Sequence, residues 1–196
     1  MIKRGQEWAR TADGPHGQIV TSDAELASAM GREVVLRGGD VHRSLGAPSG
    51  EASDRIVEVD LLEIRADGHV IGRAASHVLI GRPPRRLGRL VGGWVIVCNA
   101  GFVGPYDVAP GAHPGDGRAD VVRVAASMSP RQRLGALRRS RLGAHLPHPD
   151  IDITRAATFE VSLIGHVAVW ADGRRVQIDA DAASIAVVPS AVTVRL

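Results

Sequence analysis

From Arg55 onward the chain is divided into short apolar segments by turn residues, and this pattern restricts the fold more than any other feature. Residues 57–61 and 69–80 alternate between apolar and polar side chains with the period of two that is typical of half-buried strands. Further strand-like segments are 94–99, 121–125, 158–164, 167–171, 174–179, 184–188 and 191–196. Asp67-Gly68 and Asp172-Gly173 favour tight hairpins. The pattern predicts a mainly β fold, either a two-layer β sandwich or a partly closed barrel.

One prominent helix interrupts the strands. Ser129 can cap it, Pro130 suits its first position, and Gly143 can end it. We expect three leucines to form the apolar stripe of this helix, and they are Leu134, Leu137 and Leu142.

The first 54 residues show a different, α/β pattern. A short strand at 18–20 is followed by a helix with a capping box at Ser22, a strand at 33–37 and a second helix at 41–45. Residues 46–53 have the composition of a linker. We therefore predict two parts, a reduced α/β segment over residues 1–54 and a β-sandwich domain over residues 55–196.

Positive charge is concentrated in two arginine clusters, although the net charge is only +3. The clusters contain no acidic residue and consist of Arg82, Arg85, Arg86 and Arg89, and of Arg131, Arg133, Arg138, Arg139 and Arg141. Such clusters attract lipid headgroups, nucleotides or nucleic acid. Nucleic acid is disfavoured because aromatic residues make up only 3% of the chain, which removes base stacking. Alternatively, arginine is simply the default cation here, since Lys3 is the only lysine.

The single cysteine, Cys98, excludes an internal disulfide, and its apolar neighbours predict a buried, inert thiol. No apolar run is long enough to span a membrane, and the first residues do not resemble a signal peptide. We expect a cytoplasmic protein, with peripheral binding at the inner face of the membrane as an extension of that expectation.

Two loops carry candidate ligand-binding residues. Gly38-Gly39-Asp40 lies between a strand and a helix, where backbone N–H groups can bind a phosphate, although the same residues also form ordinary turns. Asp116 and Asp120 lie in a glycine-rich loop and could bind Mg²⁺, or else form a turn and an exposed strand start.

Histidines and one further aspartate complete the candidates. His113 can donate to a phosphate or hold its loop in place, and His145 can bind an anion or cap the preceding helix. His145 and His148 flank a proline, so they do not form a helical metal pair. Taken locally, Asp172-Gly173 is a structural turn.

The run from Val97 to Val121 resembles the C-terminal half of bacterial diacylglycerol kinase-type lipid kinases, and the similarity extends over about residues 56–196. The matching positions are Asn99, Gly104, Ala109, Pro110, Ala112, Asp116, Gly117, Asp120 and Val121. The resemblance implies a β-sandwich lobe that holds the acyl part of a lipid, beside a nucleotide-binding lobe with a G-G-D-G-T motif. It also implies that Asp172, the aspartate of a late D-G-E segment, activates the lipid hydroxyl, with Mg²⁺ neutralising phosphate charge. His113, Arg138 and His145 are expected to contact a lipid headgroup or phosphate.

Two departures from the family pattern weaken ATP binding and catalysis. Val41-His42 stands where Gly-Thr is expected, and Arg174 replaces the glutamate of D-G-E. We therefore hypothesise a lipid-kinase-like pseudoenzyme that binds an acyl lipid or phospholipid, with its arginines facing the headgroup or a membrane surface. The alternatives are an active ATP-dependent lipid kinase and a structural protein that forms a homodimer or binds a partner chain. The sequence leaves open whether the chain is an enzyme.

Overall fold

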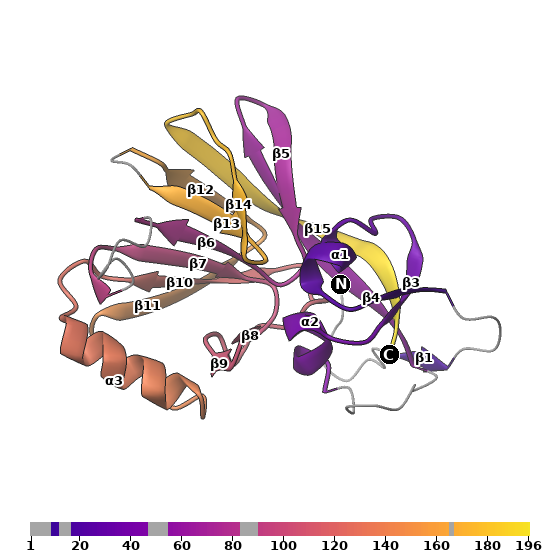
Figure 1. Cartoon of the computed structure of the whole chain (residues 1–196), viewed down its shortest axis with the longest axis horizontal. Coiled ribbons are helices and arrows are strands. Elements are labelled where there is room, and N and C mark those ends of the chain that lie inside the picture. Colours follow the sequence, from indigo (N-terminus) through magenta and orange to yellow (C-terminus); the bar gives the residue numbers. More distant parts are fainter. Residues whose placement is uncertain (1–8, 12–16, 47–54, 83–89, 165–166) are drawn as a thin grey trace.

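The computed structural model describes residues 9–11, 17–46, 55–82, 90–164 and 167–196. Most of the strands in these ranges belong to two stacked β-sheets, which confirms the predicted β sandwich (Figure 1). The first sheet consists, within the sandwich, of β5 (His69–Ala74), β4 (Arg55–Ala66), β15 (Ala182–Arg195) and β12 (Thr158–Ser162). The second sheet consists of β11 (Ile151–Ala156), β10 (Ala119–Val124), β7 (Trp94–Cys98), β6 (His77–Gly81), β13 (Ala168–Ala171) and β14 (Arg174–Val176), in that order.

The N-terminal segment extends the first sheet beyond the sandwich. β3 (Glu33–Leu36) pairs in parallel with the last residues of β15, and β2 (Gln18–Val20) pairs in parallel with β3. β1 (Arg10–Thr11) pairs with the start of β4. The long strands β4 and β15 therefore run through both parts of the molecule, as Figure 1 shows. Two short helices accompany these strands, α1 (Asp23–Ala27) and α2 (Gly39–Ser44).

Aliphatic side chains fill the space between the two layers of the sandwich. This core includes Leu62 and Ile64 of the first sheet and Val78, Val97 and Val121 of the second, all of which are almost fully buried. A separate core joins the N-terminal segment to the start of β4 and the end of β15. Cys98 lies on the other face of the second sheet and is fully buried, as predicted, and burial raises the pKa of its thiol.

Both predicted Asp-Gly hairpins are present. Asp67 and Gly68 join β4 to β5 with φ angles of 49° and 79°, and Asp172 and Gly173 join β13 to β14 with φ angles of 45° and 78°. Two successive residues with positive φ match the right-handed twist of the flanking strands. A smaller hairpin of β8 (Phe102–Val103) and β9 (Tyr106–Asp107) follows β7.

The prominent helix α3 (Pro130–Ser140) begins at Ser129 with a complete capping box, as predicted in part, but it presents an unexpected face to the sheet. Its buried residues are Arg133, Ala136 and Ser140. The three leucines are 44%, 40% and 86% exposed, in the order Leu134, Leu137 and Leu142. The prediction of a buried leucine stripe was therefore wrong, because Arg133 takes the buried position by hydrogen bonding to backbone carbonyls.

Two sequence predictions lie mostly outside the described residues. They are the linker at 46–53, of which only Gly46 is described, and the first arginine cluster, of which only Arg82 is described. Among the helices of the described ranges, none combines the length and the apolar composition that crossing a lipid bilayer requires.

Candidate functional site

Three aspartates and a histidine converge where the N-terminal segment meets the sandwich. Asp23 begins α1, Asp40 lies in α2, His77 begins β6, and Asp172 lies in the turn between β13 and β14. His77 Nδ1 lies 3.9 Å from Asp40 Oδ2. The negative charges of Asp23 and Asp40 tend to raise the pKa of His77. Asp23 likewise tends to raise the pKa of Asp40, and Asp40 that of Asp172. We call these four residues the acidic cluster.

Asp172 joins its hairpin to the segment between β5 and β6. Its carboxylate accepts the backbone N–H groups of Ala75 at 2.7 Å, Ser76 at 3.0 Å and His77 at 3.0 Å. Burial raises the pKa of Asp172, these three hydrogen bonds lower it in part, and the charge of Asp40 raises it further. The carboxylate therefore has a clear structural role, and its predicted role as a catalytic base stays a prediction.

The predicted phosphate-binding residues are engaged by Asp23. The N–H groups of Asp40 and Val41, at the start of α2, donate to the Asp23 carboxylate at 2.7 Å and 3.0 Å. Gly39 has a φ of 90°, and a Cβ atom there would lie 2.5 Å from Asp23 Oδ1. A phosphate bound at these N–H groups would have to replace a carboxylate that is already in contact with them. As arranged here, the residues do not fit a nucleotide phosphate.

The α2 helix is fixed to the β8–β9 hairpin by charged contacts. The Asp40 carboxylate accepts the N–H of Gly104 at 2.9 Å and 3.1 Å. The Arg43 guanidinium donates to the carbonyl of Gly104 at 2.9 Å and lies 4.1 Å from the centre of the Phe102 ring. Burial raises the pKa of Asp40, although the hydrogen bond from Gly104 opposes this effect.

The predicted metal ligands Asp116 and Asp120 lie close together, but an arginine binds both of them. Arg155 of β11 donates to Asp120 Oδ1 at 2.5 Å and to Asp116 Oδ2 at 3.4 Å, and it also donates to the carbonyl of Gly111. In the ranges that the structure describes, no group of three or more His, Cys, Asp or Glu residues could hold a metal ion. The guanidinium already balances the two carboxylates, so the residues as arranged do not fit Mg²⁺. The Mg²⁺ site stays a prediction that requires Arg155 to move.

The residues predicted to contact a headgroup differ in their environments. Arg138 is exposed on α3, His113 is half-buried in its loop, and His145 is buried. His145 Nε2 lies 3.1 Å from the carbonyl oxygen of Val108 and can donate to it. Burial lowers the pKa of His145, so the neutral ring is favoured. A headgroup site shared by these residues stays a prediction.

Two buried polar residues, Asp60 and Asn99, have structural roles that the sequence patterns did not predict. The buried Asp60 carboxylate accepts the N–H groups of Ser190 at 2.8 Å and Gly117 at 2.7 Å, where the pairing of β4 with β15 is irregular. Asn99 Nδ2 donates at 2.8 Å to the carbonyl oxygens of Asp60 and Ala75. Two features of the sequence could have pointed to these residues. Asp60 is an acid within the largely apolar strand β4, and Asn99 is the only asparagine in the chain.

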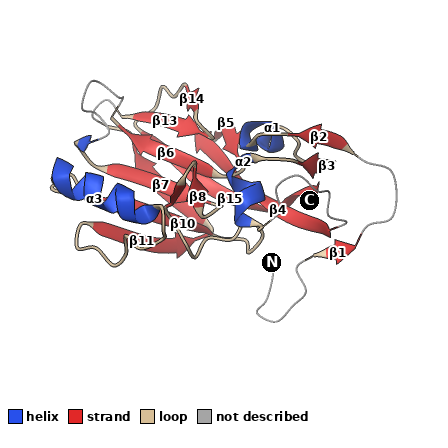
Figure 2. Ribbon diagram, turned by 60° about the horizontal axis from the view of Figure 1, so that its bottom comes forward, coloured by secondary structure: helices blue, strands red, loops and turns tan. Residues whose placement is uncertain are grey.

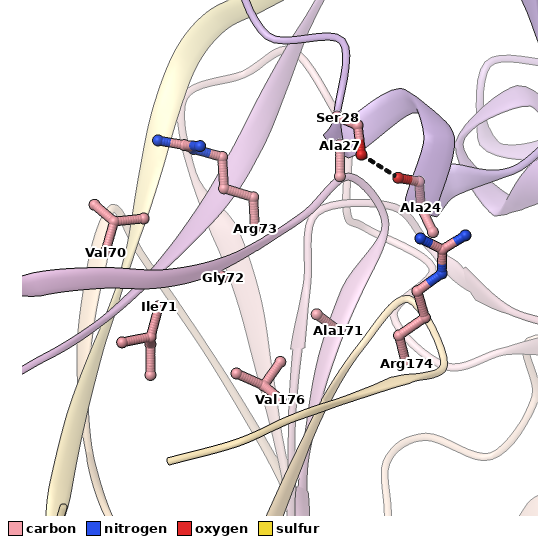
Figure 3. Close-up of a pocket in the computed structure, with 10 residues that line it drawn as sticks. All are labelled: Ala24, Ala27, Ser28, Val70, Ile71, Gly72, Arg73, Ala171, Arg174 and Val176. Carbon is pink, nitrogen blue, oxygen red and sulfur yellow. Dashed lines mark hydrogen bonds between the residues drawn. The ribbon is translucent and has the colours of Figure 1, made fainter. Parts of the chain in front are cut away.

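A groove of about 410 Å³ opens beside the acidic cluster, between α1, β5 and the β13–β14 hairpin. Its lining consists of Ala24, Ala27, Ser28, Val70, Ile71, Gly72, Arg73, Ala171, Arg174 and Val176. Figure 3 shows Arg174 reaching from the hairpin toward Ala24 of α1, with Ile71 and Val176 on the sandwich side. Arg73 donates to Glu63 at 3.0 Å, which is its ion-pair partner. The groove thus combines apolar walls with a guanidinium, and it lies at the edge of the sandwich, not between its packed layers.

Comparison with known proteins agrees with this fold. Residues 85–196, more than half of the chain, match the family model described as YegS C-terminal NAD kinase beta sandwich-like domain. No curated protein matches the sequence.

Solved structures show the same architecture. Two structures of a "putative diacylglycerol kinase" from Bacillus anthracis strain Sterne superpose with TM-scores of 0.60 and 0.58, at 13% and 14% identity. Each covers 90% of this chain and 76% of the other chain. A third, of a diacylglycerol kinase from the same strain, has a TM-score of 0.51 at 15% identity and covers 83% of this chain and 66% of the other. The resemblance to the C-terminal lobe of these lipid kinases is therefore confirmed at the level of fold.

Proposed function

Since the chain belongs to the family of YegS C-terminal NAD kinase beta sandwich-like domains, we propose that it is a lipid-kinase-like protein that binds an acyl lipid and has weak or no ATP-dependent phosphoryl transfer. The observation that carries this proposal is the groove beside Asp172, which offers an apolar wall and a cation to one ligand.

The composition of the groove favours an amphiphile. Val70, Ile71 and Val176 provide branched apolar side chains, and two alanines of α1 complete the wall. Its volume lies within the range of about 300–1,000 Å³ that small-molecule sites occupy. Arg174 can pair with a phosphate or carboxylate headgroup while an acyl chain contacts the aliphatic side chains. The ligand therefore binds between α1 and the edge of the sandwich.

Three features argue against efficient phosphoryl transfer. Asp23 engages the N–H groups of Asp40 and Val41, which would otherwise face a phosphate. The Asp172 carboxylate already accepts three backbone N–H groups, which occupy most of its acceptor sites and leave at most one for a hydroxyl. Arg174 places a cation where the related lipid kinases have a glutamate. The proposal therefore separates lipid binding from kinase chemistry.

Binding is tested with a fluorescent phospholipid that carries a pyrene-labelled acyl chain. We expect saturable binding to the wild type and a loss of at least about tenfold in affinity for Ala24→Phe, because the ring fills the groove. The matched control is Ala182→Phe, at an exposed position of β15 outside the groove, which should bind as the wild type does. Equal affinities of all three proteins, or no binding at all, would contradict the proposal.

Catalysis is tested by radiolabel transfer from ATP to diacylglycerol in the presence of Mg²⁺. We expect the wild type to transfer little or no label, at a rate close to that of Asp172→Asn. Transfer by the wild type that is lost in Asp172→Asn would instead establish an active kinase. If the protein neither binds the labelled lipid nor transfers label, the structural alternative is favoured.

A further inference from the structure

The orientation of α3 is fixed by a buried arginine. Arg133 donates to the carbonyl oxygens of Met128 at 2.9 Å, Gly92 at 2.6 Å and Ala125 at 2.6 Å. Ala136 and Ser140 lie on the same buried face of the helix. Because three charge-assisted hydrogen bonds hold this face against the end of the second sheet, the helix cannot rotate to bury its leucines without breaking them.

The exposed side of α3 is apolar and basic at once. Leu134 and Leu137 lie one turn apart and are 44% and 40% exposed, and Leu142, just beyond the helix, is 86% exposed. Exposed leucines grouped in this way are typical of an interaction surface. The exposed arginines on and beside the helix are Arg131, Arg138, Arg139 and Arg141. We call these seven residues the α3 surface.

The α3 surface itself carries only positive charge, and the Asp107 carboxylate of β9 lies near Gly143, beyond the end of the helix. Residues 121–149 contain no acidic residue. The next acid along the sequence is Asp150, which is only partly exposed and accepts hydrogen bonds from the side chains of Ser127 and Gln132. A partner must therefore supply negative charge and an apolar layer on the same face.

We propose that the α3 surface docks on an anionic phospholipid bilayer, with α3 lying flat in the interface. The leucines insert among the acyl chains, and the arginines extend their aliphatic stems over the same layer while their guanidinium groups contact lipid phosphates. Nucleic acid would leave the leucines in water. A second copy of the chain, related by a two-fold axis, would bring the arginines of two α3 surfaces together without acids to pair with.

This surface is separate from the groove. In both overall views α3 lies at one end of the molecule and α1 toward the other (Figures 1 and 2). Membrane docking and ligand binding in the groove can therefore fail independently.

The experiment is vesicle co-sedimentation with two lipid compositions, pure phosphatidylcholine and an equal mixture of phosphatidylcholine and phosphatidylglycerol. We expect the wild type to bind the anionic vesicles at least about tenfold more tightly than the neutral ones, with binding that weakens as salt is added. The variant Leu134→Ser/Leu137→Ser/Leu142→Ser and the variant Arg131→Gln/Arg138→Gln/Arg139→Gln should each lose at least about tenfold in affinity for anionic vesicles.

Matched controls lie at the opposite end of the molecule. Ile19→Ser removes an exposed apolar side chain of β2, and Arg37→Gln removes an exposed cation just after β3. Both should bind as the wild type does, and Ala24→Phe should also bind vesicles normally. The proposal is overturned if the wild type ignores anionic vesicles or if the controls lose as much affinity as the α3 variants. It is also overturned if light scattering shows a dimer that the leucine variant dissociates.

Discussion

The carboxylate of Asp23 accepts the backbone N–H of Asp40 at 2.7 Å, and this contact joins the start of α1 to the start of α2. An aspartate at this place satisfies two donors that a helix leaves free at its first turn. The neighbouring Gly39 leaves room for it, because any side chain there would meet the carboxylate. The same arrangement stabilises the N-terminal segment and keeps anions away from these donors.

Gly39→Ala should therefore destabilise the protein by about 3 kcal/mol, of which about 1–2 kcal/mol reflects the positive φ and the rest the displaced carboxylate. The control is Gly46→Ala. Gly46 has a φ of 65°, but no atom lies within 4 Å of the added Cβ, so this variant should lose only the stability that the positive φ costs. Urea unfolding measures both. In the background Asp23→Ala, the cost of Gly39→Ala should fall to that of Gly46→Ala. A cost unchanged by removal of Asp23 would show that the contact with the carboxylate is not the cause.

Asn99→Ala should lower the free energy of unfolding by about 2–4 kcal/mol. The reason is that the carbonyl oxygens of Asp60 and Ala75 would lose their donor inside a buried site. Asn99→Asp should be at least as harmful, because it places an acceptor against two acceptors. Urea unfolding of both variants tests this, and a loss below about 1 kcal/mol would mean that water replaces the amide.

Local chemistry was readable from the sequence, whereas long-range hydrogen bonding was not. The Asp172-Gly173 turn and the Ser129 cap of α3 depend on residues within four positions of one another, and both were predicted. The three N–H groups that Asp172 accepts come from residues about 95 positions earlier, so only the folded chain shows that the turn residue also joins the two strands.

The orientation of α3 illustrates the same limit. A helix with leucines and arginines is normally expected to bury the leucines, because burial of apolar surface is favourable. Arg133 is buried instead, since three carbonyl oxygens near the end of the second sheet lie within reach of its guanidinium. The prediction of a β sandwich did not depend on which face of α3 is buried, but the proposed interaction surface does. Sequence patterns located the arginine cluster without showing which of its members face solvent.

The stability of the acidic cluster should depend on pH through His77. Burial lowers the pKa of His77, and the charges of Asp40 and Asp23 oppose this only in part, so the folded state favours the neutral ring. The unfolded chain takes up the proton first as pH falls below about 6.5, and the contribution of His77 to stability decreases there. The stability difference between wild type and His77→Gln should therefore be larger at pH 7.5 than at pH 5.5. Paired urea titrations measure it, and the comparison cancels the opposite effect of the carboxylates with raised pKa values. A difference that stays constant over this range would contradict the direction assigned to His77.

Removal of Arg155 should convert a charge-balanced pair of aspartates into a cation site. In the wild type the guanidinium contacts both Asp116 and Asp120, so millimolar Mg²⁺ should leave the unfolding temperature unchanged. Arg155→Ala leaves the buried Asp120 without its partner and should destabilise the protein by about 2–4 kcal/mol. Added Mg²⁺ should then restore part of this loss, because two carboxylates and the Gly111 carbonyl are oxygen ligands that the ion accepts. Calorimetric unfolding with and without Mg²⁺ tests this, with Arg123→Ala, an exposed arginine of β10, as the control. Stabilisation of the wild type by Mg²⁺ would show that Arg155 moves aside and that the loop binds the ion in the native protein.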